Sequence, residues 1–174
     1  MGNIISINVI RFFVIFFLQV LVLKPLSMGW MSNYFYFNIL LYPLIIILLP
    51  MRTPQIAILL IGFGLGFMVD MFYDTPGVHA SATVATAFFR TWVLAQLEPR
   101  DGYQLNIGPT KERFGFPWFA QYAIIMMLFH LLFYFVVETF AVQHVLRILA
   151  KTFYTFVWSI IAVFLFTQVW NTKD

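Results

Sequence analysis

Six long apolar runs, separated by turns and one polar stretch, are the feature that most limits what this chain can fold into. A run of about 20 apolar residues is long enough to cross a bilayer as a helix. Of the 174 residues, 62% are hydrophobic and only 10% are charged, so the chain lacks the polar side chains needed to face water on all sides. The runs predict a single-domain, all-α integral membrane protein over residues 1–174, surrounded by membrane lipid.

The positions of the runs predict a bundle of six transmembrane helices. We expect the helices at residues 4–23, 34–49, 55–72, 78–97, 118–140 and 152–170, and one cytoplasmic loop at 98–117. The first run is expected to stop at Lys24-Pro25, where a charge and a helix breaker coincide. No small-residue cleavage motif follows this run, so we interpret it as a retained span and not as a signal peptide.

The distribution of Lys and Arg between the connections predicts the orientation, because positive residues are retained on the cytoplasmic side. With the N-terminus inside, the inner connections hold five positive residues and the outer ones three. The inner set is Arg52, Arg100, Lys111, Arg113 and Lys173, and the outer set is Lys24, Arg147 and Lys151. This modest bias predicts that both termini are cytoplasmic.

The composition and motifs argue against several function classes. The chain has no Cys, which excludes disulfides, thiolate metal sites and a Cys nucleophile. It contains no His-Glu-x-x-His, Gly-x-Ser-x-Gly or Gly-x-x-x-x-Gly-Lys motif. Its net charge of +3 is scattered along the chain, which is a poor basis for nucleic-acid binding. We therefore expect no enzymatic activity, no cofactor and no resident metal.

Small residues predict close packing of the two helices that flank the turn at residues 74–77. Gly62 and Gly66 are four residues apart, the small-x-x-x-small spacing that lets two helix backbones approach closely in lipid. The stretch from His79 to Ala87 is built of small residues and offers a complementary surface. A helical hairpin closed at Asp74-Thr75-Pro76-Gly77 would bring the two surfaces together. The predicted packing positions are Gly62, Gly66, Gly77 and Ala80.

Ionisable residues inside the predicted spans need a partner or an exit to water, because burying each costs about 2.5–3.5 kcal/mol. In the predicted orientation Asp70, His79 and Glu138 all lie near the outer ends of their spans. Asp70 can accept a hydrogen bond from His79 across the turn, and Asp74 lies on the same helix face as Asp70. These residues indicate either a polar site for an ion, a ligand or a partner helix, or interfacial groups that fix the hairpin.

Three further polar residues interrupt the apolar spans. Arg90 lies thirteen residues after Gly77, about 20 Å inside the outer boundary. We expect it to extend toward the cytoplasmic headgroups; the alternative is a partner within the bundle or on another protein. Arg11 has the same two alternatives. His130 is expected to be a packed histidine with one hydrogen bond.

Two motifs resemble those of a known family. The run Gly62-Phe-Gly-Leu-Gly-Phe-Met-Val-Asp70, followed by Gly77-Val-His-Ala-Ser-Ala-Thr83, resembles the signature of MreD, the rod-shape-determining membrane protein of bacteria. The version found in Bacteroidetes is similar in three further stretches: Phe89-Arg90, the loop opening Pro99-Arg100-Asp101-Gly102-Tyr103, and His130 to Glu138. The resemblance covers essentially the whole chain.

The resemblance implies a non-enzymatic scaffold in the bacterial inner membrane that regulates cell shape and lateral peptidoglycan synthesis. Proteins of this family associate with MreC, and through it with the MreB filament and the RodA polymerase with its transpeptidase. Asp70, His79 or Glu138 would then help to fix the register of an MreC-like helix, and the loop 98–117 would touch cytoplasmic components. The family is similar in fold to the substrate-binding components of energy-coupling-factor vitamin transporters, which gives an alternative function. The short outer connections of this chain disfavour that alternative.

Overall fold

The computed structural model describes residues 2–28, 38–100, 102–103, 108–140 and 145–170. Within these residues the secondary structure is entirely helical. Four stretches of helix in the described part are long and apolar enough to cross a membrane, and they cover Ser6–Ser27, Gln55–Tyr73, Phe116–Thr139 and Val145–Val169. The protein is thus an all-α chain with four candidate membrane-spanning helices. The predicted count of six spanning helices is not reached in these residues.

The first helix continues past the expected stop at Lys24-Pro25. It consists of α1 (Gly2–Phe17), a π-helical stretch η1 (Leu18–Leu23) and α2 (Lys24–Met28). Pro25 has no N–H to donate, and local π-helical adjustments of this kind satisfy the backbone groups that a proline leaves free. In agreement, the Lys24 N–H bonds to the Gln19 carbonyl, five residues back. The prediction that the helix ends at Lys24-Pro25 was wrong, because the helix passes the proline by changing from α-helical to π-helical hydrogen bonds.

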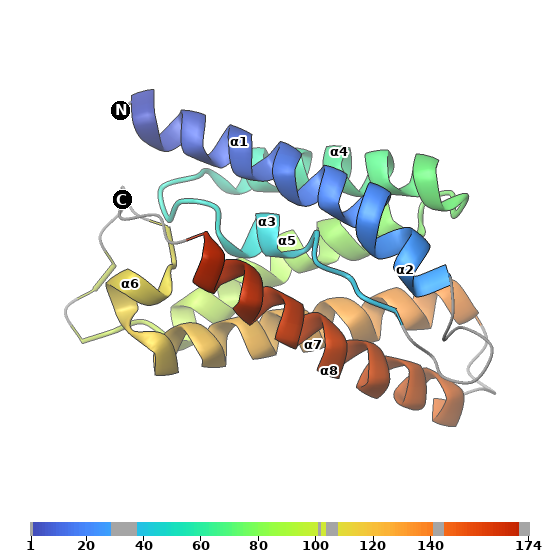
Figure 1. Ribbon diagram of the computed structural model, residues 1–174. Coiled ribbons are helices and arrows are strands. Elements are labelled where there is room, and N and C mark those ends of the chain that lie inside the picture. The colour runs from blue at the N-terminus through green and yellow to red at the C-terminus, as the bar shows by residue number, and fades with distance from the viewer. Residues whose placement is uncertain (1, 29–37, 101, 104–107, 141–144, 171–174) are drawn as a thin grey trace.

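The other long helices are α4 (Gln55–Tyr73), α5 (Val78–Gln96), α7 (Phe116–Thr139) and α8 (Val145–Val169), with a short α6 (Lys111–Phe114) before α7. α8 begins seven residues before the predicted residue 152. α5 is long enough to span but is not among the four most apolar helices. α1 begins and α8 ends at the same end of the molecule, which we call the α6 end because α6 lies there (Figure 1).

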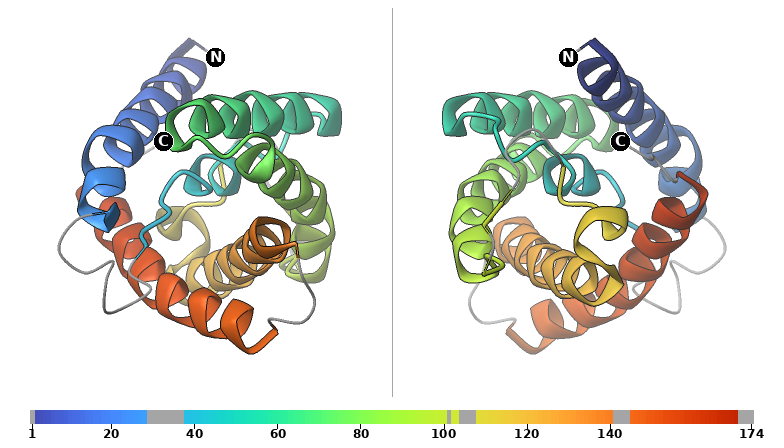
Figure 2. Two further views of the ribbon diagram at one scale, coloured as in Figure 1. Left: turned by 90° about the vertical axis from the view of Figure 1, so that its right-hand side faces the viewer. Right: turned by 90° about the vertical axis from the view of Figure 1, so that its left-hand side faces the viewer.

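The predicted helix at 34–49 is the main difference between expectation and structure. Residues 34–37 lie outside the described residues, and in the rest of this segment only α3 (Leu44–Ile47) is helical. Pro43 explains the difference, because proline removes a backbone donor and disfavours helical geometry in the residue before it. Residues 39–49 are buried, and α3 is enclosed by the long helices (Figure 2). We call residues 38–49 the central segment.

Polar side chains of the surrounding helices satisfy the backbone of the central segment. Gln19 accepts hydrogen bonds from the N–H groups of Leu41 and Tyr42 at 2.7 and 3.3 Å, and it donates to the Ile39 carbonyl at 3.0 Å. The other contacts are Ile39 N–H to Ser27 (3.2 Å), Leu40 N–H to Ser159 (2.9 Å), Tyr122 to the Ile47 carbonyl (3.2 Å) and Arg90 to the Leu49 carbonyl. Non-helical backbone is tolerated at membrane depth only when protein surrounds it in this way.

Candidate functional site

The two glycines of the small-x-x-x-small motif lie directly against α5. A methyl group at Gly66 would overlap Ala80 and Thr83 and would come within 2.6 Å of the His79 carbonyl oxygen. A methyl group at Gly62 would lie 3.2 Å from the Thr83 carbonyl oxygen, which is tight but not an overlap. The closest approach of the α4 and α5 backbones is therefore at Gly66, where only hydrogen fits.

Asp70 caps the first turn of α5 from the neighbouring helix. Its carboxylate accepts the N–H groups of His79 and Ala80, both at 2.9 Å, and that of Gly77 at 3.1 Å. The Thr75 hydroxyl donates to the same carboxylate at 3.1 Å. The first N–H groups of a helix have no partner within the helix, and a negative charge there also interacts favourably with the helix dipole. Asp70, which is 4% exposed, therefore joins the end of α4 to the start of α5.

The turn between these helices depends on two residues with left-handed backbone geometry. Asp74 ends α4 at φ 55°, and Gly77 precedes α5 at φ 85°. Both residues are exposed. Gly77 therefore serves the turn and not close helix packing: its N–H donates to Asp70, and a methyl group at its position would meet no atom within 4 Å. Asp74 is exposed, whereas Asp70, one turn earlier in α4, is buried.

A buried polar network lies where the central segment crosses α5 and α7. The Tyr42 hydroxyl is 2.8 Å from His79 Nδ1 and 2.8 Å from His130 Nε2. The other ring nitrogen of His130, Nδ1, is 2.8 Å from the Thr86 hydroxyl. All four side chains have no exposed surface. His130 thus has two hydrogen bonds, whereas one was expected from the sequence.

The hydrogen-bond pattern assigns the proton positions in this network. Thr86 donates its proton to the Ala82 carbonyl at 2.7 Å, so it must accept from His130 Nδ1–H. In neutral His130, Nε2 then accepts from the Tyr42 hydroxyl, whose oxygen accepts from His79 Nδ1–H. His79 Nε2 is left as a buried acceptor with no hydrogen-bond partner among the described residues. The network is a directional chain that begins at His79 and ends at a backbone carbonyl.

Arg90 does not extend to the headgroups. Its side chain is 2% exposed and donates to the Leu49 carbonyl at the end of the central segment. Of the two alternatives raised by the sequence, the partner within the bundle is the one observed. Arg11 is 4% exposed, and its guanidinium donates to the Asn8 side chain at 3.3 Å.

Glu138 is separate from the Asp70 and His79 cluster. Its carboxylate pairs with Lys151 of α8 at 2.8 Å, and both side chains are partly exposed. It lies one helical turn beyond Tyr134, whose ring packs against that of His79 with centroids 4.8 Å apart. Glu138 is thus one turn from a contact of His79, but its ion pair is with α8 and not with Asp70 or His79.

The predicted loop cations gather at the α6 end. Arg100 and Arg113 are exposed, and Lys111 pairs with Glu112 at 3.7 Å and with Gln168 of α8 at 3.0 Å. The described residues of the loop fold back on the helices, since Tyr103 donates to the Leu94 carbonyl at 2.8 Å. Burial, followed by the effect of Glu98, raises the pKa of Tyr103 to about 12.

Sequence reasoning missed the residues that build the centre of the molecule. Tyr42, Gln19 and Ser159 were not singled out, although each makes a buried hydrogen bond to or within the central segment. Two signals pointed to them. Pro43 makes a continuous helix across 34–49 unfavourable, and Gln19 is an isolated amide in an otherwise apolar run.

Comparison with known proteins finds no matching family model, no similar curated protein and no similar solved structure. Within the residues that the structure describes, no three His, Asp or Glu side chains form a group that could hold a metal ion. The buried polar side chains of the described residues bond to other groups of the protein itself. Their hydrogen bonds hold α4, α5, α7 and the central segment together, and they come from Asp70, Tyr42, His79, His130 and Arg90.

Proposed function

We propose that this protein is a non-enzymatic scaffold of the bacterial inner membrane, acting in the rod-shape machinery in the manner of the MreD family. In this proposal it binds an MreC-like membrane protein and, through it, an MreB-like filament and a RodA-type polymerase with its transpeptidase. Its action is to position the partners that synthesise lateral peptidoglycan. The motifs from Gly62 to Asp70 and from Gly77 to Thr83 are the basis for the family assignment.

The observation that carries the proposal is that the polar side chains of the spans are buried inside the bundle, whereas the exposed side chains are apolar. Asp70, His79 and Arg90 are at most 4% exposed and hydrogen-bond to groups of the protein itself. The outer faces of the long helices are apolar, with residues such as Leu60, Phe88 and Phe153 more than 60% exposed. A bundle that uses its polar groups internally leaves its apolar outer faces for a partner helix, which would be held there by van der Waals packing.

This division changes how a partner would be recognised. The sequence suggested that Asp70, His79 or Glu138 set the register of a partner helix. Asp70 and His79 are buried, so a partner on the outside of the bundle cannot reach them. Glu138 is partly exposed but already pairs with Lys151. We therefore propose that the partner contacts the apolar outer faces, and that the basic α6 end faces the cytoplasm.

Depletion of the protein in its bacterial host tests the proposal. We expect depleted cells to lose their rod shape and to stop inserting new wall material along their sides, as seen by labelling with a fluorescent D-amino acid. Expression of the wild-type chain from a second locus should restore both. Rod-shaped cells with normal lateral labelling after depletion would refute the proposal.

A second candidate is the substrate-binding component of an energy-coupling-factor vitamin transporter. A cavity of about 500 Å³ between α1 and α4 favours it, because this volume lies in the range of small-molecule sites. The lining of the cavity is mainly apolar, whereas sites for polar vitamins need several converging polar groups. Thermal unfolding of the detergent-purified protein with a panel of vitamins tests this candidate, which predicts a ligand-dependent rise in unfolding temperature.

A further inference from the structure

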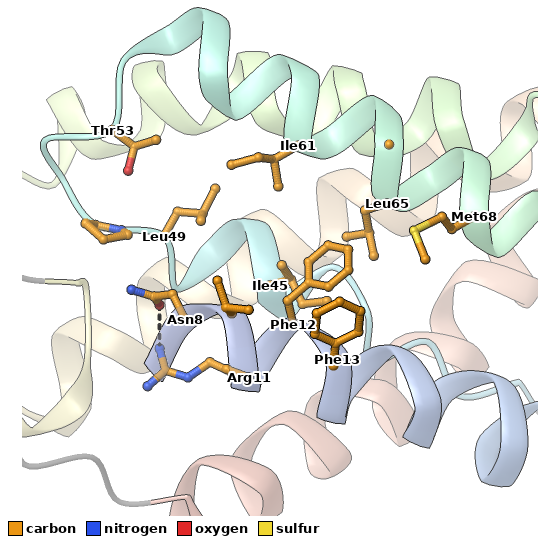
Figure 3. Close-up of a pocket in the computed structure, with 13 residues that line it drawn as sticks. Asn8, Arg11, Phe12, Phe13, Ile45, Leu49, Thr53, Ile61, Leu65 and Met68 are labelled. Atoms are coloured by element: carbon orange, nitrogen blue, oxygen red, sulfur yellow. Dashed lines mark hydrogen bonds between the residues drawn. The ribbon is translucent and has the colours of Figure 1, made fainter. Parts of the chain in front are cut away.

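A groove between α1 and α4 is left open by the way these helices pack. α1 packs on the central segment and meets α4 where the rings of Phe16 and Phe72 lie 5.7 Å apart. Beside this contact, a cavity of about 500 Å³ separates the two helices (Figure 3). Phe12 and Phe13 line it from α1, and Ile61 and Leu65 line it from α4. Gly64 also lines the cavity, and a methyl group at Gly64 would meet no atom within 4 Å. The groove is thus an apolar cleft along the side of the bundle.

The dimensions of the groove limit what can occupy it. Its lining reaches from Thr53, just before α4, to Met68, which is about 20 Å along the helix axis. Counted to the surfaces of the lining atoms, the empty space is about 1170 Å³, which over this length gives a mean cross-section of at most roughly 60 Å². A helix with its side chains is about 10–12 Å wide and has a cross-section of roughly 80–110 Å². A single hydrocarbon chain is far narrower, since carbon atoms in contact lie about 3.5–4.0 Å apart.

One end of the groove is polar and basic. Asn8 and Arg11 of α1 lie side by side at this end and Thr53 lies across the groove from Arg11, whereas Phe13 and Met68 lie at the other end (Figure 3). The guanidinium of Arg11 is hydrogen-bonded to Asn8 and supplies the charge of the lining. Arg52 is exposed beside Thr53. This is also the end that carries the cations of the predicted cytoplasmic loop, where anionic lipid headgroups are attracted to basic residues.

We propose that the groove binds one acyl chain of an anionic phospholipid, taken from the leaflet at the α6 end. The chain lies between α1 and α4 along Gly64, and the phosphate lies at the polar end near Arg11 and Thr53. The narrow cross-section excludes a complete helix, the apolar lining matches a hydrocarbon chain, and the position of Arg11 matches an anionic headgroup. The lipid would complete the packing that α1 and α4 leave unfinished.

Native mass spectrometry of the full chain tests this proposal. The protein is placed in nanodiscs of palmitoyl-oleoyl phosphatidylglycerol or of the matching phosphatidylcholine, released, and activated until peripheral lipids leave. We expect one phosphatidylglycerol to be retained per protein, with at least fivefold less retention of phosphatidylcholine. Gly64→Leu extends a side chain into the groove from a position where a methyl group would meet no atom within 4 Å, and it should lower phosphatidylglycerol retention at least tenfold. Leu60→Phe, an exposed position outside the cavity lining, is the matched control and should retain the lipid.

Two further variants separate lipid binding from misfolding. Ile61→Trp fills the groove from a second position and should also expel the lipid, and both filling variants should unfold at temperatures near that of the wild type. Arg11→Gln should reduce the preference for phosphatidylglycerol over phosphatidylcholine to less than twofold. Unchanged retention in the folded Gly64→Leu and Ile61→Trp variants would overturn the proposal. Photo-crosslinking from position 64 to a protein and not to lipid would overturn it as well.

Discussion

Replacing Gly66 by Ala tests the central packing contact of the fold. The new methyl group would overlap Ala80 and Thr83 and would lie 2.6 Å from the His79 carbonyl oxygen. Normal contact distances of about 3.5–4.0 Å can return only if the backbones of α4 and α5 separate by roughly 1 Å. That movement would disturb the whole hairpin, because Asp70 holds the start of α5 from α4 one turn further along.

Two opposing effects set the change in the free energy of unfolding expected for Gly66→Ala. Overpacking a close contact costs about 1–3 kcal/mol, and replacing Gly by Ala in a helix gains up to about 1 kcal/mol in helix propensity. Gly64→Ala has the same propensity gain but meets open space. The difference between the two variants therefore isolates the packing cost, about 1–3 kcal/mol. For a chain of this size that corresponds to about 2–12 °C in unfolding temperature.

The assay is thermal unfolding of the detergent-purified variants, followed by the fluorescence of the five Trp residues. We expect Gly64→Ala to be at least as stable as the wild type and Gly66→Ala to be the least stable. Gly62→Ala should fall between them, because its methyl group would lie 3.2 Å from the nearest atom. Equal stability of Gly66→Ala and Gly64→Ala would refute the argument that close backbone approach holds the hairpin.

Three further substitutions test the polar contacts. Asp70→Asn should lower the free energy of unfolding by about 3–6 kcal/mol, because all four donors lose a charged acceptor and two of them face an NH2 group that cannot accept. The measurement is thermal unfolding, and an unchanged unfolding temperature would contradict the capping role. Gln19→Leu should lower the free energy of unfolding by about 2–4 kcal/mol, because two buried N–H groups of the central segment lose their acceptor. The amide hydrogen of Leu41 should then exchange faster, and an unaltered exchange rate would contradict this expectation. Glu138→Gln should cost less than about 1 kcal/mol in the same thermal assay, because its pair with Lys151 is partly exposed; a larger loss would indicate a buried role.

The long helices could be predicted because, in lipid, the apolar composition of a run is enough to indicate a helix. A run of apolar residues has few alternatives to a helix in a bilayer, so α4 and α7 begin and end within two residues of their predicted bounds. The hairpin could also be anticipated, since the Gly62 and Gly66 spacing and the Pro-Gly turn are local signals. These features depend on residues close together in the sequence.

The centre of the molecule could not be predicted in the same way. Hydropathy predicts a spanning helix at residues 34–49, because the segment is apolar. In the structure, the backbone N–H and C=O groups of the central segment instead form hydrogen bonds with Gln19, Ser159 and Arg90, which come from distant parts of the chain. The link between His79 and His130 passes through Tyr42, which comes from a third element. Contacts of this kind depend on tertiary packing and leave only weak local signals, such as the proline at position 43.

In-cell photo-crosslinking tests the central claim, that the bundle works by holding other membrane proteins, most directly. A photoreactive residue is placed at the exposed positions Leu60, Phe88 and Phe153, one on each of α4, α5 and α8, and the crosslinked proteins are identified by mass spectrometry. The proposal predicts that an MreC-like protein with a single transmembrane helix is captured from one of these faces and not from the buried position Thr86. Capture of a transporter ATPase and its membrane subunit, with no wall-synthesis protein, would contradict it.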